Sequence, residues 1–161
     1  MDNKITSISE IQIAIKAALE KNSYFAVHGV PILIENAKDI EYQIKSAMGS
    51  LGIVATVSTP SLTYAGIYKG RPNEIEHGSD FPYWTINTGN IVIVENPTLN
   101  RGRANYATAL DTALQAALTI QQVPNICDAS ITQTTSGGLV VVNVQFKTNL
   151  TFALERVADQ L

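Results

Sequence analysis

A glycine turn between two strongly alternating segments constrains the fold of this chain more than any other feature. Ser136-Gly137-Gly138 separates the segment Ala129–Thr135 from the segment Leu139–Thr148. In the second segment, side chains alternate with the two-residue period of a half-buried strand. Two such segments around a glycine-based turn predict a β-hairpin. One face of the second strand carries Val140, Val142, Val144 and Phe146, and the other carries Val141, Asn143 and Gln145.

The N-terminal segment predicts an amphipathic helix. Ser7 and Glu10 have the spacing of a capping box, in which a serine side chain and a glutamate three residues later satisfy the first backbone groups of a helix. Apolar residues then recur at helical spacing, so we expect a helix over residues 8–21. Its apolar stripe consists of Ile8, Ile11, Ile15, Ala18 and Leu19.

The next part of the chain predicts a strand–helix–strand unit. Tyr24–His28 and Val30–Glu35 are short apolar runs that we expect to form strands. A helix is expected to follow Asn36, with apolar positions recurring as far as Leu51. Ile53–Thr59 is rich in β-branched residues and predicts another strand. The unit is βαβ-like or an α+β variant of that arrangement.

The middle of the chain combines an irregular segment with a strand. Tyr64–Tyr83 contains three glycines and two prolines, which predict a long loop at about residues 66–82. Trp84–Val94 predicts a strand, with a bulge or tight bend at Gly89-Asn90. The apolar residues between 150 and 161 allow a last helical turn or two.

A second clear helix is predicted over Ala104–Ile120. Between Ala104 and Phe146 the sequence carries only two charged residues, Asp111 and Asp128. A neutral helix face is either simply solvated or a subunit contact, because interface cores are depleted in charge. One side of the predicted helix comprises Ala107, Leu110, Leu114, Ala117 and Leu118, and the other comprises Thr108, Asp111, Thr112, Gln115 and Thr119.

These segments together predict one α+β domain over residues 1–161. Its expected architecture is a single layer of mixed β-sheet with two or three helices packed on it and a C-terminal β-hairpin. An apolar content of 45% excludes simple disorder. The longest apolar runs are far too short to span a bilayer, so we expect no membrane association. No basic flank followed by an apolar run is visible at the N-terminus, so no secretory signal is expected.

Titratable side chains give no complete catalytic or metal-binding pattern. His28 lies in an apolar run, whereas His77 lies near Glu74, Glu76 and Asp80, where a solvated acidic loop is the simpler interpretation than a cation site. The single cysteine, Cys127, excludes an internal disulfide, fits a reducing compartment and is expected to be a buried structural thiol. Nucleophile-elbow and phosphate-loop motifs are absent from the sequence. We therefore expect no enzymatic activity, no metal and no cofactor.

The basic residues fall in two segments. Lys69 and Arg71 lie in the predicted loop, and Arg101 and Arg103 precede the second clear helix. Three interpretations of these four basic side chains are open, namely that they face solvent, a phosphate backbone or the acidic surface of a partner subunit. A formal net charge of −3 argues against general or sequence-specific nucleic-acid binding. Within the loop, the aromatic residues Tyr68 and Phe81 are candidate apolar anchors for a partner.

The segment Val92–Arg101 resembles small tail-completion proteins of bacteriophages and prophages, which include tail terminators. The resemblance rests on a strand that ends in Glu95-Asn96-Pro97, followed by Asn100-Arg101 and an alanine-rich helix. It extends upstream over Asp39–Thr59, where a helix, Leu51-Gly52 and a strand follow one another. By this resemblance, Glu95, Asn96, Pro97, Asn100 and Arg101 shape the turn after the central strand.

What the resemblance implies is a structural protein of the virion tail, assembled in the cytoplasm of the bacterial host. Such terminators form a ring, usually hexameric, on the end of the tail tube and offer a surface to the head connector. The partners expected from it are therefore further copies of the chain and tail-tube or head-connector proteins. Alternatives are another head–tail connector or baseplate component, or a small-molecule-binding α+β domain unrelated to phages.

Overall fold

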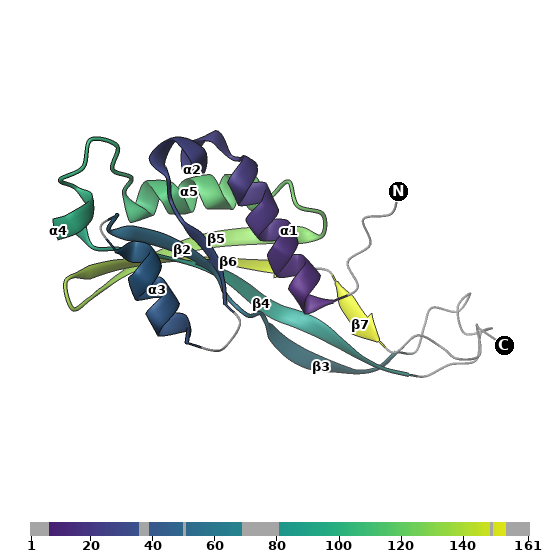
Figure 1. Ribbon diagram of the computed structural model, residues 1–161. Coiled ribbons are helices and arrows are strands. Elements are labelled where there is room, and N and C mark those ends of the chain that lie inside the picture. The colour runs from purple at the N-terminus through teal and green to yellow at the C-terminus, as the bar shows by residue number, and fades with distance from the viewer. Residues whose placement is uncertain (1–6, 36–38, 50, 69–80, 149, 154–161) are drawn as a thin grey trace.

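The computed structural model describes residues 7–35, 39–49, 51–68, 81–148 and 150–153. These residues form five helices and seven strands, arranged as a mixed sheet with helices on both of its faces (Figure 1). The predicted α+β class is confirmed. In chain order, the elements are α1 (Ile8–Lys21), α2 (Ser23–His28), β1 (Ile32–Ile34), α3 (Ile40–Met48), β2 (Ile53–Val57), β3 (Ser61–Tyr68), β4 (Phe81–Glu95), α4 (Pro97–Asn100), α5 (Ala109–Ile120), β5 (Ile126–Ser136), β6 (Leu139–Thr148) and β7 (Thr151–Ala153).

Strand β4 is the central strand of the sheet and pairs with four other strands. Along one side it pairs antiparallel with β2 and then with β3, which continue one another in nearly constant register. Along its other side it pairs antiparallel with β6 and then with β7. The strand β1 adds to β2 in parallel, and β5 adds to β6 in antiparallel, so that the main path is β1-β2-β4-β6-β5.

The two faces of the sheet are covered by different helices. Two successive residues of β2 illustrate this, because their side chains point to opposite faces. Ala55 belongs to the core under α1 and α5, whereas Val54 packs with Met48 of α3. Helices α1, α2 and α5 therefore cover one face, and α3 covers part of the other. The larger core includes Ile11, Ile15 and Leu19 of α1, Ile91 and Ile93 of β4, and Val142, Val144 and Phe146 of β6.

Two sequence predictions are confirmed, although the first strand of the hairpin begins at Ile126, three residues before the predicted Ala129. Helix α1 spans residues 8–21, and the Ser7 hydroxyl accepts a hydrogen bond from the Glu10 backbone N–H at 3.3 Å. The hairpin β5–β6 turns at Gly137 and Gly138, whose φ angles are 57° and 80°. A two-residue turn with positive φ at both positions suits the twist of a hairpin and favours glycine. Strand β7 follows this hairpin.

The predicted strand at Tyr24–His28 is wrong, because this segment forms helix α2. The Asn22 side chain accepts a hydrogen bond from the Tyr24 backbone N–H at 2.7 Å and so caps the helix. Gly29, with φ at 64°, ends it in the left-handed conformation. A short apolar run does not distinguish helix from strand by periodicity, and here the capping residues decide the outcome.

The long loop predicted at residues 66–82 is also corrected at both ends. Strand β3 extends to Tyr68 and β4 begins at Phe81, so these two residues lie opposite each other in a two-stranded arm. Residues 69–80 lie outside the described part of the chain. The helical turns expected after residue 150 are replaced by β7 where the structure describes the chain, over Thr151–Ala153.

The interruption predicted near Gly89 takes the form of a bulge just before it. Ser61 pairs with Thr88 and Leu62 pairs with Ile86, so β4 has one extra residue at this point. Gly89 itself lies against the ring of Phe146, which is fully buried on β6. Glycine is needed here for close packing, since its φ is not in the left-handed region.

Replacement of Gly89 by alanine should destabilise the fold by about 1–3 kcal/mol, because the added methyl group would overlap the Phe146 ring. Urea unfolding would measure this change. The matched control is Gly102→Ala, since nothing lies within 4 Å of a Cβ added at Gly102. Equal stabilities of the two variants would contradict the packing argument.

Candidate functional site

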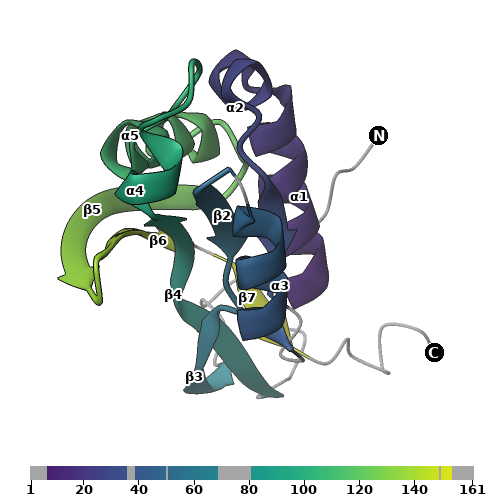
Figure 2. The ribbon, with the colours of Figure 1, turned by 60° about the vertical axis from the view of Figure 1, so that its left-hand side comes forward.

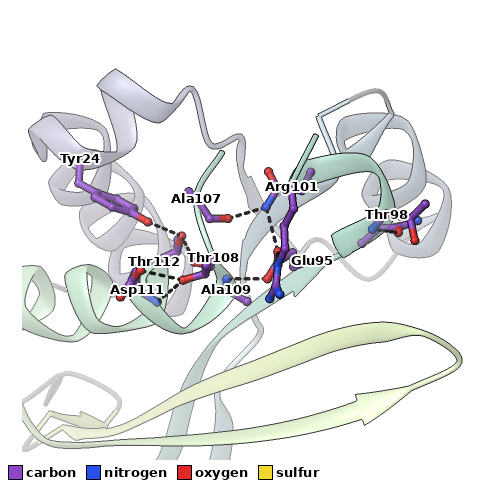
Figure 3. A network of polar contacts seen from close by, with 11 residues as sticks. Tyr24, Glu95, Thr98, Arg101, Ala107, Thr108, Ala109, Asp111 and Thr112 are labelled. Carbon is purple, nitrogen blue, oxygen red and sulfur yellow. Dashed lines mark hydrogen bonds and ion pairs between the residues drawn. The ribbon is translucent and has the colours of Figure 1, made fainter. Parts of the chain in front are cut away.

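The turn after β4 is built around a buried carboxylate. Glu95 is the last residue of β4, and its side chain is only 1% exposed. Its Oε1 accepts a hydrogen bond from the Ala109 backbone N–H at 2.9 Å. Its Oε2 accepts two more, from Asn100 Nδ2 at 3.0 Å and from Arg101 Nε at 3.1 Å (Figure 3). One side chain thereby joins the end of the central strand, the turn and the start of α5.

The residues between these contacts form the single-turn helix α4. Asn96 caps it by accepting a hydrogen bond from the Thr98 backbone N–H at 3.1 Å, and Pro97 occupies its first position. The Asn96 backbone N–H donates to the Gly52 carbonyl at 2.7 Å, which ties the turn to the start of β2. Gly52 has φ at 77°, and a Cβ there would lie 2.6 Å from the backbone nitrogen of Asn100. Only glycine fits this contact.

Asn100 closes the turn from inside. It is fully buried, and its Nδ2 donates to the Ala107 carbonyl at 2.6 Å as well as to Glu95. Among the described residues no donor reaches its Oδ1. These contacts hold residues 101–108 as a loop, so α5 begins at Ala109 rather than at the predicted Ala104.

The start of α5 carries a second set of polar contacts. Thr108 caps the helix, accepting from the Asp111 backbone N–H at 3.1 Å and donating to the Asp111 carboxylate at 2.9 Å. The hydroxyls of Tyr24 and Thr112 are 3.2 Å apart, which links α2 to α5 (Figure 3). The Glu95 carboxylate also lies at this helix N-terminus, where the helix dipole favours negative charge.

The environment of Glu95 favours its ionised form. Burial alone would raise the pKa of this carboxyl group, but the hydrogen bonds from Ala109, Arg101 and Asn100 together hold the pKa below its ordinary value. The same pairing raises the pKa of Arg101. The Glu95 carboxylate is ionised and buried, and both of its oxygens accept hydrogen bonds. It therefore holds the turn together and is not placed to exchange protons with a bound molecule.

The structure brings together all five turn residues that the resemblance indicated. Of the four basic residues singled out, Arg101 pairs with Glu95, and Arg103 Nη1 donates to the Leu51 carbonyl at 3.4 Å. Lys69 and Arg71 lie outside the described residues. Tyr68 and Phe81 pair across the described end of the β3–β4 arm.

The remaining candidates for chemistry are dispersed. His28 lies in α2, with Nδ1 3.2 Å from the Asn105 carbonyl. His77, Glu74, Glu76 and Asp80 lie outside the described residues. Over the ranges that the structure describes, no three metal-ligating side chains come together. The prediction that Cys127 is buried is wrong, because this thiol is exposed near a bulge in the outer strand β5.

The leucines of α5 lie on its exposed face, although the sequence grouped them on one side with Ala107 and Ala117, which are buried. Leu110, Leu114 and Leu118, called here the leucine stripe, are 51%, 48% and 50% exposed. The helix instead packs on the sheet through small side chains, with Thr112 and Thr119 also buried. The residues buried in this way are Ala109, Thr112, Ala113, Ala116, Ala117, Thr119 and Ile120. The sequence carries two signals of this arrangement. The alanines recur at helical spacing, as residues that share a buried face do, and the leucines recur every four residues on a separate face.

A shallow depression lies between the C-terminal ends of α1 and α5. Its volume is about 290 Å³, and its lining includes Lys21, Asn22, Leu118 and Thr119. Two of these residues are joined, since Asn22 Nδ2 donates to the Thr119 hydroxyl at 2.7 Å. Lys21 is the one charged residue of this lining, so the depression offers no converging set of acids and bases.

Comparison with known proteins gives no family assignment. No protein-family model matches the chain, and no curated protein sequence matches it. Among the helices of the described residues, none is long and apolar enough to cross a membrane.

Replacement of Glu95 by glutamine should lower the free energy of unfolding by roughly 1.5–3 kcal/mol at neutral pH, because charged hydrogen bonds in a buried site are lost. The difference from the wild type should shrink on acidification. A carboxyl group whose pKa is lowered by folding stabilises the fold above its ordinary pKa of 4.5, and this contribution disappears as the pH falls through the lowered value.

Urea unfolding of both proteins across the acidic range would measure this difference. The control is Glu20→Gln on the exposed side of α1, which should change stability little at any pH. A Glu95→Gln variant as stable as the wild type at neutral pH would rule out the structural role of this carboxylate.

Proposed function

We propose that this chain is a structural subunit of a bacteriophage or prophage tail. In this proposal it is a tail-completion protein of the terminator type, which forms a ring of its own copies at the end of the tail. The ring contacts the tail tube or the head connector. It belongs to the virion and is assembled in the cytoplasm of the bacterial host. The proposal gives the chain no catalytic role and no cofactor.

The observation that carries the proposal is the construction of the turn after β4. The residues that resemble tail-completion proteins, Glu95 to Arg101, are joined in one hydrogen-bonded unit. The Glu95 carboxylate, the Asn100 side-chain nitrogen and Arg101 Nε are engaged with neighbouring backbone and side chains, so their chemistry serves to fix the geometry of the chain. A fixed corner between the central strand and α5 suits a protein whose function is to present surfaces to its neighbours.

The surfaces themselves support assembly rather than catalysis. The leucine stripe presents three half-exposed leucines on one helix, and Asp111 is the single charged residue of α5. Exposed apolar patches of this kind mark interaction sites, and low charge reduces the cost of desolvation on contact. The β3–β4 arm supplies a second surface, where Leu62 and Trp84 are also partly exposed.

Inactivation of the gene in its phage or prophage should produce tails of uncontrolled length that do not join filled heads. Both defects are expected because a terminator stops growth of the tube and then provides the docking surface for the head. Negative-stain electron microscopy of lysates would measure tail length and the fraction of joined particles. A plasmid copy of the gene should restore both.

The same experiment separates the alternatives. A connector would leave tail length normal and block only joining, and a baseplate component would prevent tail formation from the start. Normal tails with an unaltered yield of infectious particles would refute any essential tail role. That result would favour the small-molecule-binding alternative.

A further inference from the structure

The β3–β4 arm carries apolar side chains on the same face of the sheet as α1. Figure 2 shows β3 and the adjoining part of β4 extending beyond the helices. At the inner end of the arm this face is buried, since Ile86 is 4% exposed and belongs to the larger core, against which Ile8 of α1 packs. Beside and beyond Ile86 the face opens, because Leu62 and Trp84 are 43% and 46% exposed.

The strand register places apolar side chains of three strands together on this face. Leu62 of β3 lies opposite Ile86, and Phe152 of β7 lies opposite Trp84. Directly paired residues point to the same face of a sheet, and so do residues two apart in one strand. Phe152 is partly buried and packs against the larger core. Leu62, Trp84 and Phe152, called here the Trp84 surface, therefore form one apolar surface across β3, β4 and β7.

The sequence that follows β7 separates apolar from polar side chains at helical spacing. Residues 154–161 lie outside the described part of the chain, and their sequence is Leu-Glu-Arg-Val-Ala-Asp-Gln-Leu. At about 100° per residue, the four apolar side chains fall on one half of a helix and the four polar side chains on the other. With the two-residue period of a strand, each face would mix both kinds. A helix this short is not stable alone in water, so it needs a surface to fold against.

We propose that residues 154–161 fold back as a short helix onto the Trp84 surface of the same chain. Their apolar half covers Trp84 and Leu62, and their polar half faces solvent. The point of attachment favours this occupant, because β7 ends at Ala153, which pairs with Tyr83 directly beside Trp84. A surface that begins next to the attachment point is met at a high effective concentration.

The length of the segment agrees with the contact. Leu62 lies two strand spacings from β7, which is about 10 Å across the sheet. A helix of eight residues is about 12 Å long, so it can extend from Phe152 to Leu62.

Other segments outside the described residues lack a comparable apolar stripe. Residues 69–80 join β3 to β4, and Ile75 is their single aliphatic side chain. Residues 1–6 contain Met1 and Ile5 alone. By composition, residues 154–161 are therefore the segment best suited to cover the Trp84 surface.

The proposal concerns the free chain and does not depend on the tail assignment. The docked segment presents Glu155, Arg156, Asp159 and Gln160 to solvent on this side of the arm. An assembly contact through Leu62 and Trp84 would then require its release. The test below uses the purified chain, so its failure leaves the phage experiment unaffected.

Trp84 is the only tryptophan of the chain, so its fluorescence reports on this surface alone. Val157→Glu places a charge on the apolar half of the segment and should release it. Quenching of Trp84 by acrylamide should then rise at least twofold, and its emission should move to longer wavelength. The matched control is Gln160→Glu, which adds the same charge to the polar half and should leave both readings unchanged. Equal quenching in the wild type and Val157→Glu would overturn the proposal.

Cross-linking distinguishes the chain's own segment from that of a second copy. In a Cys127→Ser background, Leu62→Cys is combined in turn with Val157→Cys, Leu161→Cys or Asp159→Cys. Oxidation in dilute solution should link Leu62→Cys within one chain to either position of the apolar half, several times faster than to Asp159→Cys on the polar half. Equal rates at all three positions would contradict a docked helix. Covalent dimers in place of internal links would also overturn the proposal, since a second copy would then be the occupant.

Discussion

Every part of the sheet depends on the backbone pairing of a single strand. Strand β4 has 15 residues and is paired on both of its sides, with β2 and β3 on one and with β6 and β7 on the other. The Glu95 carboxylate at its end then fixes where α5 begins. The helix, with its exposed leucine stripe, and the outer hairpin are thus placed relative to one strand.

The sequence predicted those elements whose ends are set by local chemistry. The cap at Ser7 and the glycine pair at 137–138 mark the first helix and the hairpin, and both predictions are confirmed. Elements decided by distant contacts were missed. Strand β3 contains glycine and aromatic residues typical of a loop, and it is a strand because β4 lies beside it. In α5, the sequence placed Leu110, Leu114 and Leu118 on one side with Ala107 and Ala117, yet these leucines are exposed. The alanines are buried instead, because a helix with small side chains can lie close to the sheet.

The site was predictable in part for the same reason. The resemblance indicated a turn at Glu95–Arg101, and the residues of that turn do act together. The sequence did not indicate that Glu95 is buried, since one of its partners, the Ala109 backbone N–H, lies 14 residues away and becomes available only when a helix starts there. Cys127 has no catalytic pattern around it, so it was expected to be a buried structural thiol. Its exposure follows from the place of β5 at the edge of the sheet, which no local pattern specifies.

The position of β4 in the chain has a consequence for biosynthesis. Its partners on one side, β2 and β3, precede it, whereas β6 and β7 follow it after α5 and β5. About 50 residues must therefore be translated after Glu95 before the second side of β4 can be paired. At about 5–20 residues per second this interval lasts roughly 3–10 s. During it the uncharged segment Ile91–Val94 lacks its β6 partner, which leaves an apolar strand edge unpaired.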